Sequence, residues 1–312
     1  MLLLLSGCTS SAQDLSFLDP QGPVAAAQRT HLIGIVAIVL IVVLPVIVLA
    51  PLYAWRYRYR NSSAPYTPRW AFSRPLEFVI WGVPFAIVIG LAVWLSKSTL
   101  ALDPYKPRSP DTPLHIQVIG YDWKWLFIYP RSGVASMGLL AFPAGRPLSL
   151  DLTSDTVMQS FFIPALGSQI YAMGGMVTHL HLAADAPGRF LGENTQYNGK
   201  GFAQQKFIAR AMTPADYHAW IRHVRTTGIR LTPGVYDVLR KRATKTAARK
   251  ALHADRMPDG EVYFTGVSPQ LFGNVVRSFH GGPSTSAALV RGMASGYGSK
   301  SGAGPARATA AE

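Results

Sequence analysis

The stretch TSDTVMQSFFIPALGSQIYAMGGM, which runs from Thr153 to Met176, decides how the second half of the chain is interpreted. It consists of short apolar and aromatic runs that proline or glycine residues separate. Runs of this length, bounded by turn residues, are typical of short strands. The stretch therefore predicts a strand at 159–163, and the same reasoning predicts strands at 176–182 and 203–209.

Strand patterns also precede this stretch. The segment His115–Tyr129, HIQVIGYDWKWLFIY, is rich in β-branched and aromatic residues. The segment Arg146–Leu152 alternates leucines with other residues, which is the period of a strand with one buried face. Together these segments predict an antiparallel β-sandwich of about 100 residues.

The pattern changes again after residue 212. Thr213–Val224 begins with a threonine that can cap a helix and a proline that suits the first helical position. The basic stretch Val235–Ala254 and the segment Val262–Phe279 are also expected to be helical. From residue 281 the chain is rich in glycine, serine and alanine, so we expect a disordered tail at 281–312.

Two uncharged apolar runs lie in the first third of the chain. Leu32–Tyr53 and Phe78–Leu95 are long enough to cross a hydrocarbon layer about 30 Å thick as helices. Prolines interrupt both runs, but membrane helices tolerate proline. The two runs therefore predict a transmembrane helical hairpin at 31–97, followed by an exported domain at 98–212 and a helical C-terminal extension at 213–280.

The charge pattern predicts how this hairpin is oriented. The loop Ala54–Leu76 carries five arginines and no acidic residue until the helix that follows it. Short loops rich in arginine stay in the cytoplasm, so both termini are expected on the other side of the membrane. The net charge is +14, but the basic residues beyond two spans suit anionic lipid or an acidic partner better than nucleic acid.

The chain has a single cysteine, Cys8, in the opening sequence MLLLLSGC. Leu5 to Cys8 resembles the lipobox of bacterial lipoproteins, which implies cleavage after residue 7 and a lipid anchor on Cys8. Residues 1–7 are then a residual signal peptide, and 8–30 is an extracytoplasmic N-terminal segment. The alternative is a lone thiol without a role.

Two ordered blocks carry a wider resemblance, GYDWKWLFIYP at Gly120–Pro130 and the stretch quoted first. Following two predicted spans, they resemble subunit II of the haem–copper oxidases, and within it the ubiquinol oxidase branch of the cytochrome bo type. The resemblance runs from Cys8 to Phe279. It implies two transmembrane helices, an all-β cupredoxin-like sandwich and a partly helical C-terminal extension.

The cytochrome c oxidase branch of this family binds a dinuclear copper centre, and its ligand positions can be located in this chain. Gln159 stands where that branch has its first histidine ligand. The other ligands of that branch lie in the pattern C-S-E-x-C-G-x-x-H-x-x-M, which aligns with residues 194–205 of this chain, where each ligand residue is replaced. The substituted positions are Gln159, Asn194, Gln196, Asn198, Phe202 and Gln205. Thiolate, imidazole and thioether ligands are all lost, so no metal is expected in this chain.

The resemblance implies a noncatalytic role. Haem b, haem o and a mononuclear copper are expected in the partner subunit I, which oxidises ubiquinol, reduces oxygen and pumps protons in a bacterial inner membrane, together with subunits III and IV. Quinol meets subunit I within the membrane, so a copper relay is unnecessary. The alternative is a membrane-tethered lipoprotein whose sandwich binds a ligand independently of any oxidase.

Individual residues leave alternatives open. Glu77 lies at the cytoplasmic start of the second span, where the resemblance implies proton entry into the K pathway of subunit I; a carboxylate favoured by the helix N-terminus is the other reading. Trp123 and Trp125, expected on one face of one strand, are interpreted as core or interface aromatics. The pair His179 and His181 has no evident third metal ligand. Met173 and Met176 are interpreted as flexible packing near an interface.

Overall fold

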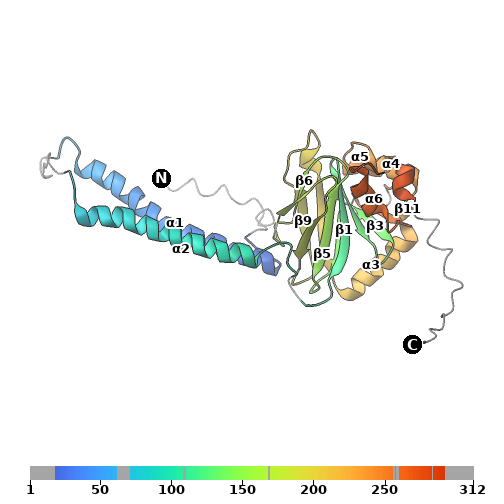
Figure 1. Cartoon of the computed structure of the whole chain (residues 1–312), viewed down its shortest axis with the longest axis horizontal. Helices are drawn as coiled ribbons and strands as arrows, with labels where there is room; N and C mark the ends of the chain where they lie inside the picture. The colour runs from blue at the N-terminus through green and yellow to red at the C-terminus, as the bar shows by residue number, and fades with distance from the viewer. Residues whose placement is uncertain are drawn as a thin grey trace, which may run out of the picture. The chain divides into compact units, whose positions relative to one another are not determined.

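The computed structural model describes residues 18–61, 71–107, 110–167, 169–255, 257, 260–282 and 284–291. Two compact units divide the chain (Figure 1). One is helical and consists of Ala26–Lys106, and the other contains the remaining described residues. Cys8 and the proposed signal peptide lie outside the described residues, as do 292–312.

The helical unit contains the two expected apolar helices. They are α1, Pro23–Arg56, and α2, Arg74–Ala101, of 34 and 28 residues. At 1.5 Å per residue they are about 51 Å and about 42 Å long, so each is long and apolar enough to cross a membrane. The helices continue through Pro45, Pro51 and Pro84. Gly34 allows close packing, because a Cβ atom there would lie 2.3 Å from the Trp94 ring.

The second unit is a sandwich of two sheets, as expected. The larger sheet has the order β11-β12-β3-β2-β1-β5-β8 and the smaller one β4-β10-β9-β6-β7. The strands are β1 Leu114–Tyr121, β2 Lys124–Tyr129, β3 Val134–Met137, β4 Leu139–Pro143, β5 Leu148–Ser154, β6 Gln159–Phe162, β7 Gln169–Ala172, β8 Thr178–Leu182, β9 Gly188–Asn194, β10 Lys206–Met212, β11 Ile229–Arg230 and β12 Val262–Thr265. The pairs β1–β5, β4–β10 and β11–β12 are parallel, so the expectation of a purely antiparallel sandwich is wrong.

Within the described residues, five α-helices follow β10. They are α3 Pro214–Thr227, α4 Pro233–Arg240, α5 Lys245–Ala251, α6 Leu271–Ser278 and α7 Ser286–Val290. Thr213 caps α3, and its hydroxyl accepts a hydrogen bond from the Asp216 amide, as the sequence predicts. The expected helix at 262–279 is instead β12 followed by α6, and the one at 235–254 is two helices. The presence of α7 corrects the expectation that disorder begins at residue 281.

Two hydrophobic cores lie on opposite faces of the larger sheet. The first core fills the space between the sheets and includes Trp125, Phe161 and Phe207. The second lies between the larger sheet and the C-terminal helices, and includes Leu126 and Tyr236. Every residue of β2 is buried, because both faces of this strand are covered. The C-terminal extension is therefore part of the sandwich domain, to which it adds β11 and β12.

Candidate functional site

Four of the six substituted copper positions lie together at one end of the sandwich. Gln159 begins β6, Asn194 ends β9, and Asn198 lies in the loop that follows β9. Gln205 follows a short 3-10 helix, η2, Phe202–Gln204. Gln159 and Gln205 are completely buried, and Asn194 and Asn198 are nearly so. These four side chains are called the amide cluster below.

Gln205 is the centre of the amide cluster. Its Oε1 accepts hydrogen bonds from Asn194 Nδ2 at 3.0 Å and from Asn198 Nδ2 at 2.7 Å. Its Nε2 donates to Gln159 Oε1 and, at 3.2 Å, to the carbonyl oxygen of Tyr121. The Gln205 side chain thus connects three strands, β1, β6 and β9, with the loop that carries Asn198.

Asn194 fixes the backbone of the loop beside it. Its Oδ1 accepts hydrogen bonds from the amides of Ser160 at 2.8 Å and Gln196 at 3.0 Å. Gln196 joins the cluster through its backbone, since its carbonyl oxygen also accepts from Asn194 Nδ2 at 2.8 Å. The Phe202 ring packs on Tyr197, with 5.8 Å between ring centroids, and its carbonyl oxygen accepts a hydrogen bond from the Gln205 amide at 3.0 Å.

The amide cluster extends into the turn before β6. Gln159 Nε2 donates to Thr156 Oγ1 at 3.2 Å and to Ser154 Oγ at 3.4 Å. The backbone of β1 approaches closely, because a Cβ atom at Gly120 would lie 2.6 Å from Gln159 Oε1. A side chain at position 120 would therefore displace the Gln159 amide from the amide cluster.

The donor set of the amide cluster does not fit a copper centre. Dinuclear copper needs thiolate and imidazole ligands, whereas these four side chains are neutral amides that hydrogen-bond to one another. Among the described residues, the one side-chain atom of the cluster without a partner is Asn198 Oδ1. The amide cluster can fix the conformation of the loop after β9, but its side-chain amides cannot transfer electrons.

The two tryptophans do not share a strand face, so that expectation is wrong. Trp123 lies in the turn between β1 and β2 with a φ of 67°, and its Nε1 donates to the Asn198 carbonyl oxygen at 3.3 Å. Its ring lies against Gly201. Trp125 is 1% exposed and packs edge-on against Phe161, so it has the core role. An interface role for Trp123 stays a prediction.

His179 contacts an aspartate on another strand, which the sequence around His179 does not predict. Asp151 on β5 contacts two histidines: its Oδ1 lies 2.7 Å from His179 Nδ1, and its Oδ2 lies 2.7 Å from His115 Nε2 on β1. The hydrogen bond to Asp151 raises the pKa of His115. Burial alone would raise the pKa of Asp151, but the hydrogen bonds with the two histidines hold it below its usual value. No group of three or more potential ligands in the described part of the chain is arranged to hold a metal ion.

His115, Asp151 and His179, called the histidine cluster below, predict a small dependence of the free energy of unfolding on pH. The raised pKa of His115 gives stability that is complete below about pH 6.5 and is lost as the pH rises through the folded-state value. The lowered pKa of Asp151 gives stability that is lost as the pH falls through its own folded-state value. We expect Asp151→Asn to lower the free energy of unfolding by less than about 1 kcal/mol at pH 6, because these side chains are partly exposed. The loss should be smaller at pH 8.5 in thermal unfolding; an equal loss at both pH values would contradict this reading.

Glu77 lies in the first turn of α2, as expected. Its Oε2 accepts a hydrogen bond from Trp81 Nε1 at 3.0 Å, one helical turn later. This position suits a carboxylate at a helix N-terminus, and the role in proton entry stays a prediction.

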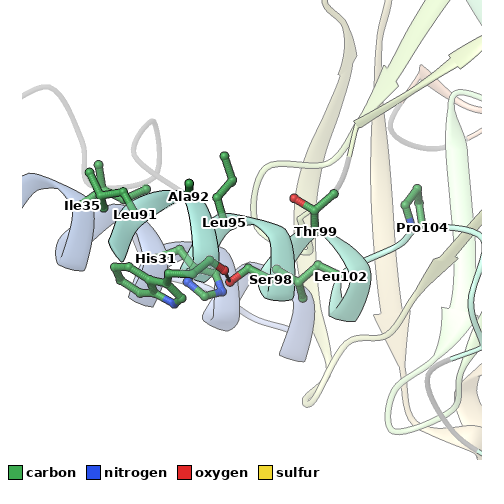
Figure 2. Close-up of a pocket in the computed structure, with 10 residues that line it drawn as sticks. His31, Ile35, Leu91, Ala92, Leu95, Ser98, Thr99, Leu102 and Pro104 are labelled. Atoms are coloured by element: carbon green, nitrogen blue, oxygen red, sulfur yellow. Dashed lines mark hydrogen bonds between the residues drawn. The ribbon is translucent and has the colours of Figure 1, made fainter. Parts of the chain in front are cut away.

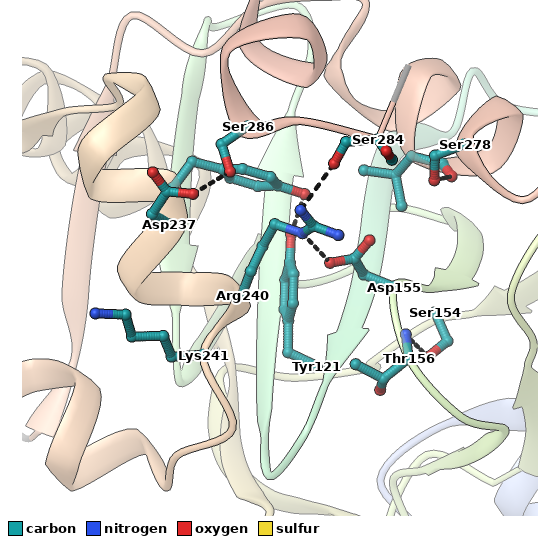
Figure 3. Close-up of polar contacts among 12 residues, drawn as sticks. Tyr121, Ser154, Asp155, Thr156, Asp237, Arg240, Lys241, Ser278, Ser284 and Ser286 are labelled. Carbon is teal, nitrogen blue, oxygen red and sulfur yellow. Dashed lines mark hydrogen bonds and ion pairs between the residues drawn. The ribbon is translucent and has the colours of Figure 1, made fainter. Parts of the chain in front are cut away.

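A polar cluster that the sequence did not indicate joins the sandwich to its C-terminal extension (Figure 3). Asp155, whose side chain is 3% exposed, accepts a hydrogen bond from Arg240 Nε of α4 at 2.9 Å. Arg240 Nη1 also donates to the Ser284 carbonyl oxygen at 2.9 Å, and the Tyr121 hydroxyl donates to that of Tyr236 at 2.9 Å. Burial raises the pKa of Asp155, although Arg240 opposes this. The turn before β6 therefore bonds to Gln159 through Ser154 and Thr156, and to α4 through Asp155.

Comparisons with known proteins agree with the resemblance. No protein-family model matches the chain. Ubiquinol oxidase subunit 2 of Acetobacter aceti is 41% identical over 283 residues, which is 90% of this chain and 86% of that protein. Cytochrome bo(3) ubiquinol oxidase subunit 2 of Pseudomonas putida is 41% identical over 259 residues, 83% of this chain and 80% of that protein. Among solved structures, the periplasmic domain of subunit II of cytochrome oxidase of Bradyrhizobium japonicum is 22% identical, covers 36% of this chain and 94% of that domain, and has a TM-score of 0.35.

Proposed function

Since this chain belongs to the family of ubiquinol oxidase subunit 2 proteins, we propose that it is the noncatalytic subunit II of a proton-pumping ubiquinol oxidase. Its role in this proposal is to support the assembly and stability of subunit I, which carries haem b, haem o and copper. Subunits III and IV complete the complex. The complex oxidises ubiquinol and reduces oxygen.

The observation that carries the noncatalytic role is the amide cluster. A subunit that accepted electrons from a soluble donor would need a redox group near its surface, and Gln159, Asn194, Asn198 and Gln205 are not redox-active. Their hydrogen bonds connect β6, β9 and the loop after β9, at the end of the sandwich where the copper-ligand positions lie, without a metal. Ubiquinol, which dissolves in the membrane, can deliver its electrons to subunit I directly.

The placement in the membrane follows from the charges. In this proposal α1 and α2 span the bacterial inner membrane, and the arginine-rich loop between them lies in the cytoplasm. The sandwich and its C-terminal helices then lie in the periplasm. A lipid anchor on Cys8 would hold the N-terminal segment on that same side.

Purification of the intact complex tests the proposed function. The chain, extracted in mild detergent through an affinity tag, is expected to co-purify with a large haem-bearing subunit that shows the spectrum of haems b and o and oxidises ubiquinol. Elemental analysis of the chain, separated from that subunit, is expected to find no stoichiometric copper. A chain that purifies alone would support the tethered lipoprotein instead, and bound copper would overturn the noncatalytic role.

Glu77 is proposed to assist proton entry into subunit I from the cytoplasm. The support is its place in the first turn of α2, next to the arginine-rich loop. We expect Glu77→Ala to slow ubiquinol oxidation by the assembled oxidase several-fold, and Glu77→Asp to restore most of the rate. The measurement is oxygen consumption per haem, with haem content as the control for assembly. Full turnover by a fully assembled Glu77→Ala enzyme would leave only the helix-terminus role.

A further inference from the structure

The described segment before the apolar part of α1 belongs to the sandwich unit. Residues up to Ala25 group with the sandwich, and the helical unit begins at Ala26. Val24 and Ala25, in the first turn of α1, are 1% and 0% exposed, and they are the two buried residues that the structure describes in this helix. The segment Leu18–Ala25 is called the N-terminal strap below.

The next turns of α1 pack on α2. His31 and Ile35 line an apolar groove of about 450 Å³ together with Leu91 and Leu95 of α2 (Figure 2). The His31 ring also meets the Trp94 ring edge to face, with 5.2 Å between their centroids. The N-terminal strap is therefore distinct from the helical hairpin, although α1 runs through both.

Gln21 fastens the N-terminal strap to both sheets of the sandwich. Its backbone N–H donates to the Ala165 carbonyl oxygen at 2.8 Å, in the turn between β6 and β7 of the smaller sheet. Its carbonyl oxygen accepts from the Asp185 amide at 3.0 Å, in the segment that follows β8 of the larger sheet. One strap residue thus bridges two connections of the sandwich through its backbone.

The space around Gly22 has no room for a side chain. A Cβ atom there would lie 2.2 Å from the Ala183 carbonyl oxygen and 3.5 Å from Leu166 Cδ2. Because the nearer atom belongs to the backbone, no change of rotamer relieves that contact. Gly22 is buried, so the strap is fitted into the sandwich and does not merely lie on its surface.

Both predicted spans separate the strap from the sandwich along the chain. The strap begins before the apolar part of α1, and the sandwich follows α2. Segments on opposite sides of a bilayer cannot form hydrogen bonds with each other. Gln21 therefore reaches Ala165 and Asp185 only if α1 and α2 both cross the membrane or neither does. This argument agrees with the orientation that the arginine-rich loop predicts, and it does not use the charges.

We propose that the N-terminal strap is a topology lock: the sandwich completes its fold only when α1 has inserted with residues 18–25 on the same side as the sandwich. The inference rests on the proposed membrane placement of the hairpin. A strap that stays in the cytoplasm leaves the Asp185 amide and the Ala165 carbonyl oxygen without their partner. The connections that contain these two residues then open more readily.

Hydrogen exchange of the Asp185 amide in the purified full chain tests the strap. We expect Gly22→Val to speed this exchange on the order of ten-fold, because the strap leaves its slot and the hydrogen bond is lost. Ala26→Val, at an exposed position four residues later, is the control and should exchange as the unchanged protein does. The Asp216 amide at the start of α3 should exchange alike in all three proteins. Equal exchange at Asp185 in the two variants would overturn the proposal. Val24→Asn takes the place of Gly22→Val if the latter does not accumulate.

Arginines within α1 test the lock itself. Leu40→Arg combined with Leu44→Arg opposes insertion of α1, because a charged side chain at the centre of a membrane helix is costly. Asp19→Cys, in a chain with Cys8→Ser, reports the side of the strap, since a membrane-impermeant maleimide labels it only from outside the cytoplasm. We expect unlabelled chains to show the fast Asp185 exchange, and labelled chains with isoleucine at both leucine positions to show the slow one. An unlabelled chain with slow Asp185 exchange would refute the lock.

Failure of the lock can be told apart from failure of the proposed function. Haem content is measured on the same preparations as hydrogen exchange. A haem-bearing complex in which Gly22→Val leaves the Asp185 amide unchanged refutes only the lock. A chain that purifies without haem, but whose Asp185 amide responds to Gly22→Val, refutes only the oxidase role.

Discussion

Replacement of Gln205 by leucine is expected to lower the free energy of unfolding by about 3–5 kcal/mol, since each buried polar group left without a partner costs about 1–3 kcal/mol. Leucine has a similar size but can neither accept from Asn198 nor donate to Gln159. Both groups are buried, so water cannot easily replace the lost partner. The measurement is urea or thermal unfolding of the full chain in detergent, followed by circular dichroism.

A neighbouring glutamine provides the matched control. Gln204 is exposed, and Gln204→Leu makes the same chemical change one residue earlier in the chain. We expect its effect to stay within about 0.5 kcal/mol, as for most surface substitutions. If both variants unfold at the same urea concentration, the amide cluster contributes nothing specific to stability.

Replacement of Arg240 by methionine is expected to lower the free energy of unfolding by about 2–4 kcal/mol at pH 8. The Asp155 carboxylate would remain buried without its partner, which typically costs about 3–5 kcal/mol, and the value is reduced here because the Arg240 side chain is 32% exposed. The exposed neighbour Lys241 gives the control, since Lys241→Met removes a cation but leaves Asp155 paired.

The pH dependence of Arg240→Met separates lost charge pairing from lost packing. Burial raises the pKa of Asp155, and loss of the guanidinium raises it further. A carboxyl group with a raised folded-state pKa destabilises the fold as the pH rises through that value, because the unfolded chain gives up the proton more readily. The difference from the unchanged protein should therefore be smaller at pH 5 than at pH 8. A difference independent of pH would indicate that packing alone was lost.

The local patterns of the sequence predicted those elements whose cause is local. Apolar runs of sufficient length predicted α1 and α2, and the Thr213-Pro214 pair predicted the start of α3. The alternation of Leu148, Leu150 and Leu152 predicted β5, in which all three are completely buried. In each case the sequence pattern that predicts the element lies within a few residues along the chain.

The features that sequence did not reveal depend on partners far along the chain. The β-branched and aromatic content of His115–Tyr129 predicts strand, but it does not show that the chain turns within the segment, which forms β1 and β2. Nothing near Val262 shows that it pairs with Met137 of β3. The third member of the histidine cluster, His115, is brought to Asp151 only by the pairing of β1 with β5.

β11 and β12, the two strands of the C-terminal extension, determine where the chain can be truncated. If the polypeptide stopped at Met212, where the exported domain predicted from the sequence ends, β3 would lose its neighbour β12 and expose unpaired amide and carbonyl groups. The apolar outer side of β1 and β2 would meet water as well. Such a fragment would be prone to aggregate. A soluble fragment for crystallisation or ligand screening should therefore extend to Val290.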